Sequence, residues 1–333
     1  MRRLARIAIT SALLALTLQP GSARAATVGG QVHSHLEHLV YVANAGETND
    51  VTITGSGSTY SIHDSAGVTA GMDCTQVDAT SVTCQSSRAS FHDISVTTMD
   101  GDDIVHISSD TYTHVYGGSG NDQLFGGSDN PENMASDVLS GGPGGDTLGG
   151  APGVRTFVFY STRTAPVWVS MDGVGNDGER GEGDNVLPSI YGVTGSPKGD
   201  HFVGSTGDDF FAGFEGNDTL LGLGGSDHLD GWEGNDLIIG GQGSDRLSGG
   251  PQNDTLKGRR GDDKLHGKTG RDSLSGGGGN DTLGSVDRWV DAVTCGAGTD
   301  SATVDRNDVV AHNCENVTIE QPHGRARPRS RDR

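Results

Sequence analysis

Aspartate recurs at every ninth position across residues 195–284, and this spacing is the strongest chemical signal in the 333-residue chain. The ten aspartates are Asp200, Asp209, Asp218, Asp227, Asp236, Asp245, Asp254, Asp263, Asp272 and Asp281. Carboxylates are hard oxygen ligands of the kind that calcium takes, whereas zinc takes His or Cys, and neither recurs in the unit. The formal net charge of −21 also points to cations as partners.

Glycine and an apolar residue repeat in the same register. Every nine-residue unit begins with glycine and has Phe, Leu or Ile at position 8, and chance would align ten glycines with a probability of about 10⁻⁸. We expect the glycines at positions 1 and 4 to adopt positive φ, so that turn carbonyls converge on one point before a short strand. Lys198 and Gln252 replace the fourth glycine. Gln252 is predicted to be a weak point, because a side chain at positive φ costs about 1 kcal/mol or more.

The units resemble the RTX (hemolysin-type) calcium-binding nonapeptide repeat, G-G-x-G-x-D-x-U-x. The resemblance implies an all-β fold, a parallel β-roll (right-handed β-solenoid) in which two nonapeptides form one 18-residue coil. Alternate aspartates would line opposite edges of the roll, with Asp200, Asp218, Asp236, Asp254 and Asp272 on one edge and the other five on the second. Several calcium ions would be held by these side chains and by carbonyl oxygens of the glycine turns.

The resemblance extends the implied ligand set beyond the ten aspartates. Asp122, in the isolated unit GGSGNDQLF, and Asp146 are the implied carboxylate ligands from an earlier block. The implied turn glycines are Gly207, Gly213, Gly216, Gly222, Gly225, Gly231, Gly234, Gly240, Gly243, Gly261 and Gly270.

Calcium is expected to be required for folding of the main block. Coils about 4.8 Å apart stack each aspartate on another of like charge. One apolar side chain in every nine residues offsets little of the cost of ordering the backbone. A hard dication with about 6–8 oxygen ligands would convert this repulsion into coordination. Five aspartates on each edge leave four gaps, so the sequence predicts at most eight sites in this block.

The remaining sequence is divided around this block by changes in composition. The predicted segments are a signal peptide at 1–25, an N-terminal β region with one disulfide at 26–115, a first short RTX-like block at 116–150, an acidic β spacer at 151–194, the main β-roll at 195–285, a C-terminal cap with one disulfide at 286–320, and a basic disordered tail at 321–333. The spacer fails the EF-hand spacing, and it is open to two interpretations, a further calcium loop or a solvated acidic turn.

The N-terminus is typical of an export signal. Arg2, Arg3 and Arg6 precede an apolar run at 7–18, and residues 23–25 form an A-x-A cleavage site. The run is shorter than the roughly 20 residues of a transmembrane helix, which favours a secreted, extracellular protein without membrane insertion over a retained anchor.

The cysteine count agrees with export. Cys74, Cys84, Cys295 and Cys314 are an even number, and the local pairs Cys74–Cys84 and Cys295–Cys314 are favoured because they need no long-range closure.

Enzyme signatures are missing from the sequence. It contains neither H-E-x-x-H nor G-x-S-x-G, so the chain is predicted not to be an enzyme, and its acidity argues against nucleic acid as a partner. The predicted function is calcium binding by a secreted repeat protein. The first alternative is an extracellular adhesin or carbohydrate-binding protein that meets a cell-surface or matrix polymer. Phe214 and Trp232, stacked on one edge, could form a carbohydrate-binding platform, although an aromatic pair that only covers the edge is the favoured interpretation. The second is a secreted hydrolase with its active site in 26–194.

Overall fold

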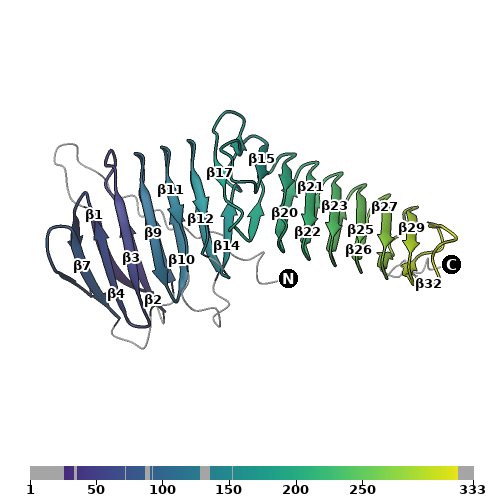
Figure 1. Ribbon diagram of the computed structural model, residues 1–333, viewed down its shortest axis with the longest axis horizontal. Helices are drawn as coiled ribbons and strands as arrows, with labels where there is room; N and C mark the ends of the chain where they lie inside the picture. Colours follow the sequence, from purple (N-terminus) through teal and green to yellow (C-terminus); the bar gives the residue numbers. More distant parts are fainter. Residues whose placement is uncertain are drawn as a thin grey trace, which may run out of the picture.

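The computed structural model describes residues 26–33, 36–71, 73–86, 91, 93–127, 136–151 and 153–321. Every element in these ranges is a strand, and the strands form one long roll (Figure 1). The predicted all-β, parallel solenoid is confirmed, with about 11 turns. The predicted signal peptide, and the predicted tail beyond residue 321, lie outside the described residues. Within the described part, no helix is long and apolar enough to cross a membrane.

One face of the roll is a single sheet that runs its whole length. Its fifteen strands, in spatial order, are β32 (Asn316–Ile319), β30 (Ser301–Val304), β28 (Thr282–Ser285), β26 (Lys264–Thr269), β24 (Arg246–Pro251), β22 (His228–Glu233), β20 (Phe210–Glu215), β18 (Gly192–Thr194), β14 (Arg155–Phe159), β12 (Ser136–Ser140), β10 (Tyr112–Tyr116), β8 (Asp93–Thr97), β2 (Leu36–Val42), β1 (Ala26–His33) and β5 (Val68–Ala70).

The opposite face is divided into two sheets. The eight-stranded sheet contains β17 (Asn185–Val186), β13 (Thr147–Gly149), β11 (Gln123–Phe125), β9 (Ile104–Ser109), β3 (Asp50–Ser56), β4 (Thr59–Asp64), β7 (Ser81–Gln85) and β6 (Cys74–Gln76). The nine-stranded sheet contains β16 (Gly178–Glu179), β15 (Val167–Ser170), β19 (His201–Val203), β21 (Thr219–Gly224), β23 (Leu237–Gln242), β25 (Thr255–Arg260), β27 (Ser273–Gly278), β29 (Ala292–Ala297) and β31 (Val309–Val310).

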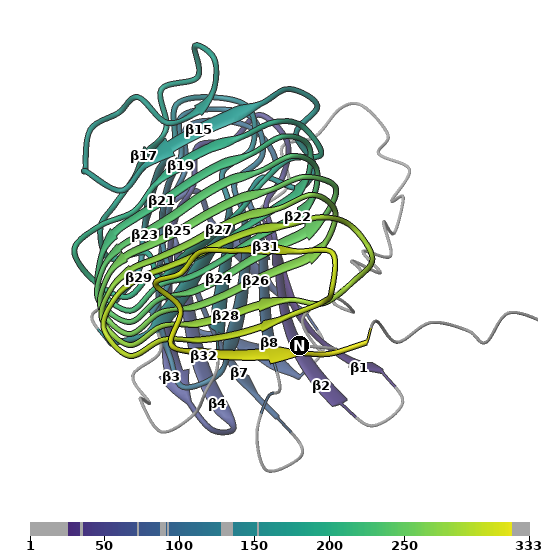
Figure 2. The same cartoon turned by 90° about the vertical axis from the view of Figure 1, so that its right-hand side faces the viewer.

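Strand register in the main block has a period of two nonapeptides. Leu229 of β22 pairs with Leu247 of β24, and Leu220 of β21 pairs with Ile238 of β23, each 18 residues apart. Successive coils therefore stack directly on one another, as the view along the roll shows (Figure 2). These apolar side chains are fully buried, because every strand points its position-8 residue inward and its neighbours outward. The 18-residue coil is confirmed.

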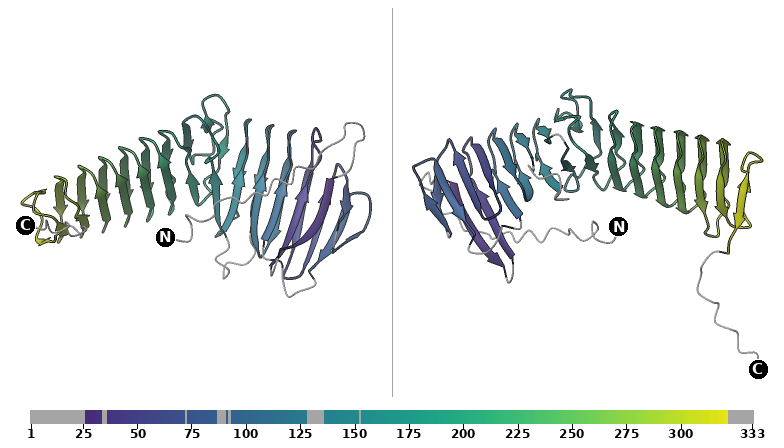
Figure 3. Two further views of the ribbon diagram at one scale, coloured as in Figure 1. Left: turned by 180° about the vertical axis from the view of Figure 1, so that it is seen from behind. Right: turned by 60° about the horizontal axis from the view of Figure 1, so that its bottom comes forward.

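The N-terminal end has hairpins and larger buried side chains. β3 pairs antiparallel with β4, and β4 with β7. Cys74 lies opposite Cys84 in the β6–β7 pair, where the two form a disulfide, and Cys295 is bonded to Cys314. The first strands (purple) and the last strands (yellow) lie at opposite ends of the roll (Figure 3). Both predicted disulfides are confirmed.

The acidic spacer interrupts one face only. β14 and β18 continue the long sheet, whereas β17 closes the eight-stranded sheet on β13, and β15 opens the nine-stranded sheet on β19. Three strands, β15, β16 and β17, therefore lie on this face between β14 and β18, and the connecting loops protrude from the roll (Figure 1).

Candidate metal centre

The repeated aspartates form two ladders, one along each edge of the roll. In each ladder, the backbone N–H of one aspartate donates to Oδ1 of the aspartate one coil later. The N–H of Asp218 lies 2.8 Å from Oδ1 of Asp236, and the N–H of Asp227 lies 2.9 Å from Oδ1 of Asp245. These side chains are 1–3% exposed. The structure therefore brings all ten predicted aspartates into two continuous series.

Both ladders continue beyond the nonapeptides. Asp272 donates its N–H to Oδ1 of Asp291, and Asp281 donates to Oδ1 of Asp300, both at 2.7 Å. Asp300 in turn donates to Oε2 of Glu315 at 2.9 Å. The prediction that Asp281 ends a series was wrong, because one inserted residue changes the spacing from 18 to 19 without removing the acid. A search for acids 19 residues apart would have found these positions.

A third ladder runs through the N-terminal half. Oδ1 of Asp103 accepts the N–H of Asn49 at 2.7 Å, and Asp122, Asp146 and Asp184 each accept from the preceding member at 2.9 Å. The predicted ligands Asp122 and Asp146 are thus neighbours on one edge. Sequence reasoning missed Asp184 as a ladder member, because the spacer places it 38 residues after Asp146.

The second oxygen of most ladder carboxylates is buried without a hydrogen-bond partner. The aspartates whose Oδ2 atoms share this property are Asp103, Asp122, Asp146, Asp218, Asp227, Asp236, Asp245, Asp254, Asp263, Asp272, Asp281 and Asp300. A buried acceptor without a partner is costly, and a buried carboxylate more so. The repetition of the same orphaned atom indicates a common ligand for these turns.

Glycine serves two different purposes in the turns. The position-1 glycines do not have positive φ, so that prediction was wrong. They are needed for space, because a Cβ on Gly213 would lie 2.0 Å from Oδ2 of Asp218 and 2.8 Å from the carbonyl oxygen of Gly231. Positive φ occurs at position 2 instead, as in Trp232 (70°). The prediction for position 4 is confirmed from residue 213 on, as in Gly234 (149°).

Gln252 occupies position 4 with the positive φ that the sequence predicted, at 77°. Its side chain offsets part of the cost of this backbone conformation, since Oε1 accepts the N–H of Gly234 at 2.8 Å.

Burial raises the pKa of the ladder carboxylates. The pKa values of Asp218, Asp227 and Asp254 rise to about 8, first because burial disfavours the charged form and then because neighbouring aspartates repel it. Main-chain hydrogen bonds lower these pKa values but do not offset the burial. At neutral pH the ladders therefore need protons or a cation.

The donor chemistry of the turns fits calcium. Among the described residues, no three His, Cys, Asp or Glu side chains are grouped as a metal-binding set. Carboxylate and carbonyl oxygens nevertheless meet, since Oδ2 of Asp227 and the carbonyl oxygen of Gly240 both face the Cα of Gly222, at 2.0 and 2.7 Å from where its Cβ would lie. An all-oxygen set rich in carbonyls suits calcium and not zinc.

A family model for the RTX calcium-binding nonapeptide repeat matches four copies in the chain, at residues 114–131, 194–229, 212–247 and 248–283. The chain carries RTX-type calcium-binding nonapeptide repeats. No curated protein matches the chain. The matched residues include the main block and the unit around Asp122 in the N-terminal half of the RTX roll.

The third ladder of the roll ends in the spacer, where a tyrosine hydroxyl donates a hydrogen bond to its last aspartate, Asp184. The hydroxyl of Tyr160 donates to Oδ2 of Asp184 at 2.9 Å, and both side chains are buried. Asp177 is also buried and accepts the N–H groups of Ser170 and Val186 at 2.6 and 2.8 Å. The interpretation of the spacer as a solvated acidic turn is therefore wrong for Asp177 and Asp184, which bond to the main chain.

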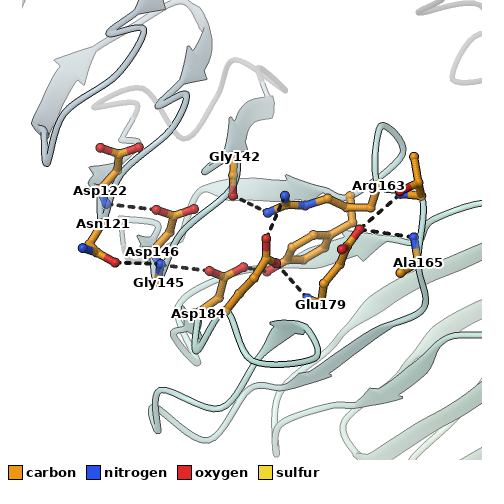
Figure 4. Close-up of polar contacts among 12 residues, drawn as sticks. Asn121, Asp122, Gly142, Gly145, Asp146, Arg163, Ala165, Glu179 and Asp184 are labelled. Atoms are coloured by element: carbon orange, nitrogen blue, oxygen red, sulfur yellow. Dashed lines mark hydrogen bonds and ion pairs between the residues drawn. The ribbon is translucent and has the colours of Figure 1, made fainter. Parts of the chain in front are cut away.

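An arginine stands beside the last turn of that ladder (Figure 4). Nη1 of Arg163 lies 2.9 Å from Oε1 of Glu182, and Nη2 donates to the carbonyl oxygen of Gly142. Its charge lowers the pKa of Asp146 and of Asp184, against the larger effect of burial. The chain thus supplies its own cation where the first stack of turns ends.

Phe214 and Trp232 stack on one edge, as the sequence predicted, with ring centroids 5.7 Å apart. They line a shallow groove together with Ser161, Pro197, Glu215 and Glu233, among other residues.

Proposed function

We propose that calcium folds and stiffens the roll of this protein outside the cell, and that the metal is structural, not catalytic. The single observation that carries the proposal is the series of buried Oδ2 atoms without partners, which repeats from turn to turn. Calcium would be held by the ladder aspartates and by carbonyl oxygens of the glycine turns. It would neutralise stacked carboxylates whose burial and mutual repulsion otherwise oppose folding.

The proposed location outside the cell rests on two supports. The N-terminal sequence has the charge pattern and cleavage site of a secretory signal. The two disulfides fit an oxidising compartment, and extracellular calcium modules bind at about 10⁻⁴–10⁻³ M.

Equilibrium dialysis and circular dichroism of the full chain test the proposal. In EDTA the strand signal of the main block should be lost, and millimolar calcium should restore it with several ions bound per chain. Magnesium should substitute poorly, because it demands octahedral geometry and keeps its waters. A strand signal that is identical in EDTA and in calcium would contradict the proposal.

The aromatic groove favours one second candidate, an adhesin whose roll presents Phe214 and Trp232 to a carbohydrate. Trp232 is 39% exposed, and an exposed indole beside Glu233 suits the faces and hydroxyls of a sugar. A glycan array with the Trp232→Ala variant as control tests this candidate, and binding that survives the substitution would exclude this groove as the binding site.

A further inference from the structure

The ten nonapeptides share one sequence period but adopt two kinds of turn. In the eight units from 213 to 284, positions 2 and 4 both have positive φ. In the first two units, at 195–212, neither position does, although the second unit keeps the position-4 glycine, Gly207. Serine stands at position 2 in these two units alone. The regular sequence therefore conceals a change of conformation after the second unit.

The change in conformation coincides with a change in carboxylate bonding. In the second unit, the N–H of Ser205 donates to Oδ2 of Asp209 at 2.7 Å, and its hydroxyl lies 3.2 Å from Oδ1. In the first unit, the N–H of Ser196 donates to Oδ2 of Asp200 at 2.7 Å, and its hydroxyl lies 2.8 Å from Oδ1. In all eight later units, Oδ2 has no partner.

The same coincidence holds for the ladder aspartates outside the main block. Asp103, Asp122, Asp146 and Asp300 have an unpartnered Oδ2, and the residue four positions before each one has positive φ. Those four residues are Met99, Gly118, Gly142 and Gly296. Residue type at this position varies, so the conformation and not glycine itself accompanies the free oxygen.

We infer that the residue at position 2 decides which turns take calcium. A turn with positive φ at position 2 leaves Oδ2 of its aspartate free for the ion. In the turns of Ser196 and Ser205, the serine N–H donates to Oδ2 of the aspartate of the same unit, and these self-closed turns bind no calcium. Serine amide and hydroxyl groups occupy, in these two units, the carboxylate oxygens that calcium would need. This inference rests on the proposed function, in which the turns hold calcium.

The two self-closed turns lie where the main block begins. Oδ1 of Asp200 also accepts the N–H of Val167 in β15 at 2.8 Å, which ties this first coil to the spacer without metal. A coil that folds without calcium provides a template on which calcium-dependent coils can add one at a time, as in other linear arrays.

A pair of reciprocal substitutions tests the inference in the full-length chain. Ser205→Gly turns residues 204–209 into GGTGDD, which matches the repeat, and should raise the calcium bound at saturation by one ion per chain. Gly241→Ser in the unit of Asp245 should lower it by one. Ser226→Gly, at exposed position 5 of the neighbouring coil on the same edge, is the matched control and should leave the number unchanged.

Equilibrium dialysis with metal analysis gives the readout, and hydrogen exchange supplies a second one. In EDTA the amide of Ser205 should stay protected while amides of 213–284 exchange. Unchanged stoichiometry in Ser205→Gly, or loss of protection at Ser205 together with the rest of the block, would overturn the inference while leaving the proposed function intact. A wild-type chain that binds no calcium would contradict both.

Discussion

The two ends of the roll have the same coiled backbone but bury different kinds of side chain. In the N-terminal half, β4 buries Tyr60 and Ile62 side by side, and Tyr60 packs edge-on against Phe91 with ring centroids 5.6 Å apart. In the main block from residue 213 on, each unit buries one Leu or Ile side chain, one aspartate and one or two glycines, as in Leu247 with its neighbours. The first interior is closed by apolar packing, whereas the second places carboxylates where apolar groups would be.

This difference shows that coil geometry does not depend on one source of stability. Apolar burial contributes about 25 cal/mol per Å², and the N-terminal half has enough large side chains to use it. The main block replaces that contribution with repeated oxygen ligands. The strands within residues 36–97 should therefore fold by themselves, whereas the main block and the third ladder from Asp103 to Asp184 should depend on the ion.

Removal of calcium should separate the two regions, and this is the largest effect we expect. In EDTA, amides of 213–284 should lose protection by more than about a hundredfold in hydrogen exchange, while amides of β3, β4 and β7 should keep theirs. Exchange followed by mass spectrometry in EDTA and in millimolar calcium measures both regions in one sample. Equal loss of protection in both would mean that residues 36–97 depend on the ion as well.

Loss of the arginine at the boundary should have the next largest effect. Arg163→Met removes the salt-bridge partner of Glu182 and the cation beside Asp146. The two side chains are 10% and 15% exposed, so the loss should be smaller than the roughly 3–5 kcal/mol of a fully buried pair. Arg155→Met, in β14 of the same coil, removes the same charge from an exposed side chain and is the control. Urea unfolding followed by circular dichroism measures the difference. Equal destabilisation by the two variants would show that the position of the charge does not matter.

The disulfide at the C-terminal end should protect the main block from fraying. Cys295–Cys314 closes a segment of 19 residues, for which chain entropy gives about 3 kcal/mol, and it holds β29 to the last turns of the ladder. A Cys295→Ala, Cys314→Ala variant should need more calcium to fold, and the last coils should exchange first. The Cys74→Ala, Cys84→Ala variant is the control, and its calcium titration should match that of the wild type.

Much of the main block was predictable because its signals are local. The nine-residue period of Asp236 and its equivalents specifies the coil, the edge and the inward leucine without reference to the rest of the chain. The ends of the ladders were not predictable in this way, because Asp184 and Asp300 depend on insertions that change the spacing. The two kinds of turn were also hidden, because position 2 takes several residue types in these units, and its φ could not be predicted from serine at 196 and 205 alone.

The pH dependence should be the smallest effect, and its sign should differ with and without metal. In the folded, metal-free chain, burial raises the pKa of Asp218 and Asp254 to about 8 and that of Asp209 to about 6. The folded state then binds more protons than the unfolded chain above about pH 4, where free aspartate ionises. By linkage, this stability is present at low pH and is lost as pH rises through about 6 to 8.

Calcium reverses this trend, because it binds the ionised carboxylate and its affinity rises over the same range. In EDTA, the main block should show a melting transition at pH 5 and none at pH 8, whereas in millimolar calcium its melting temperature should be higher at pH 8 than at pH 5. Residues 36–97 have Asp64 as the one buried aspartate among their described positions, so their stability should change less. Scanning calorimetry at the two pH values, with and without calcium, measures each transition. The same order of stability under both conditions would mean that the ladder carboxylates do not exchange protons for the ion.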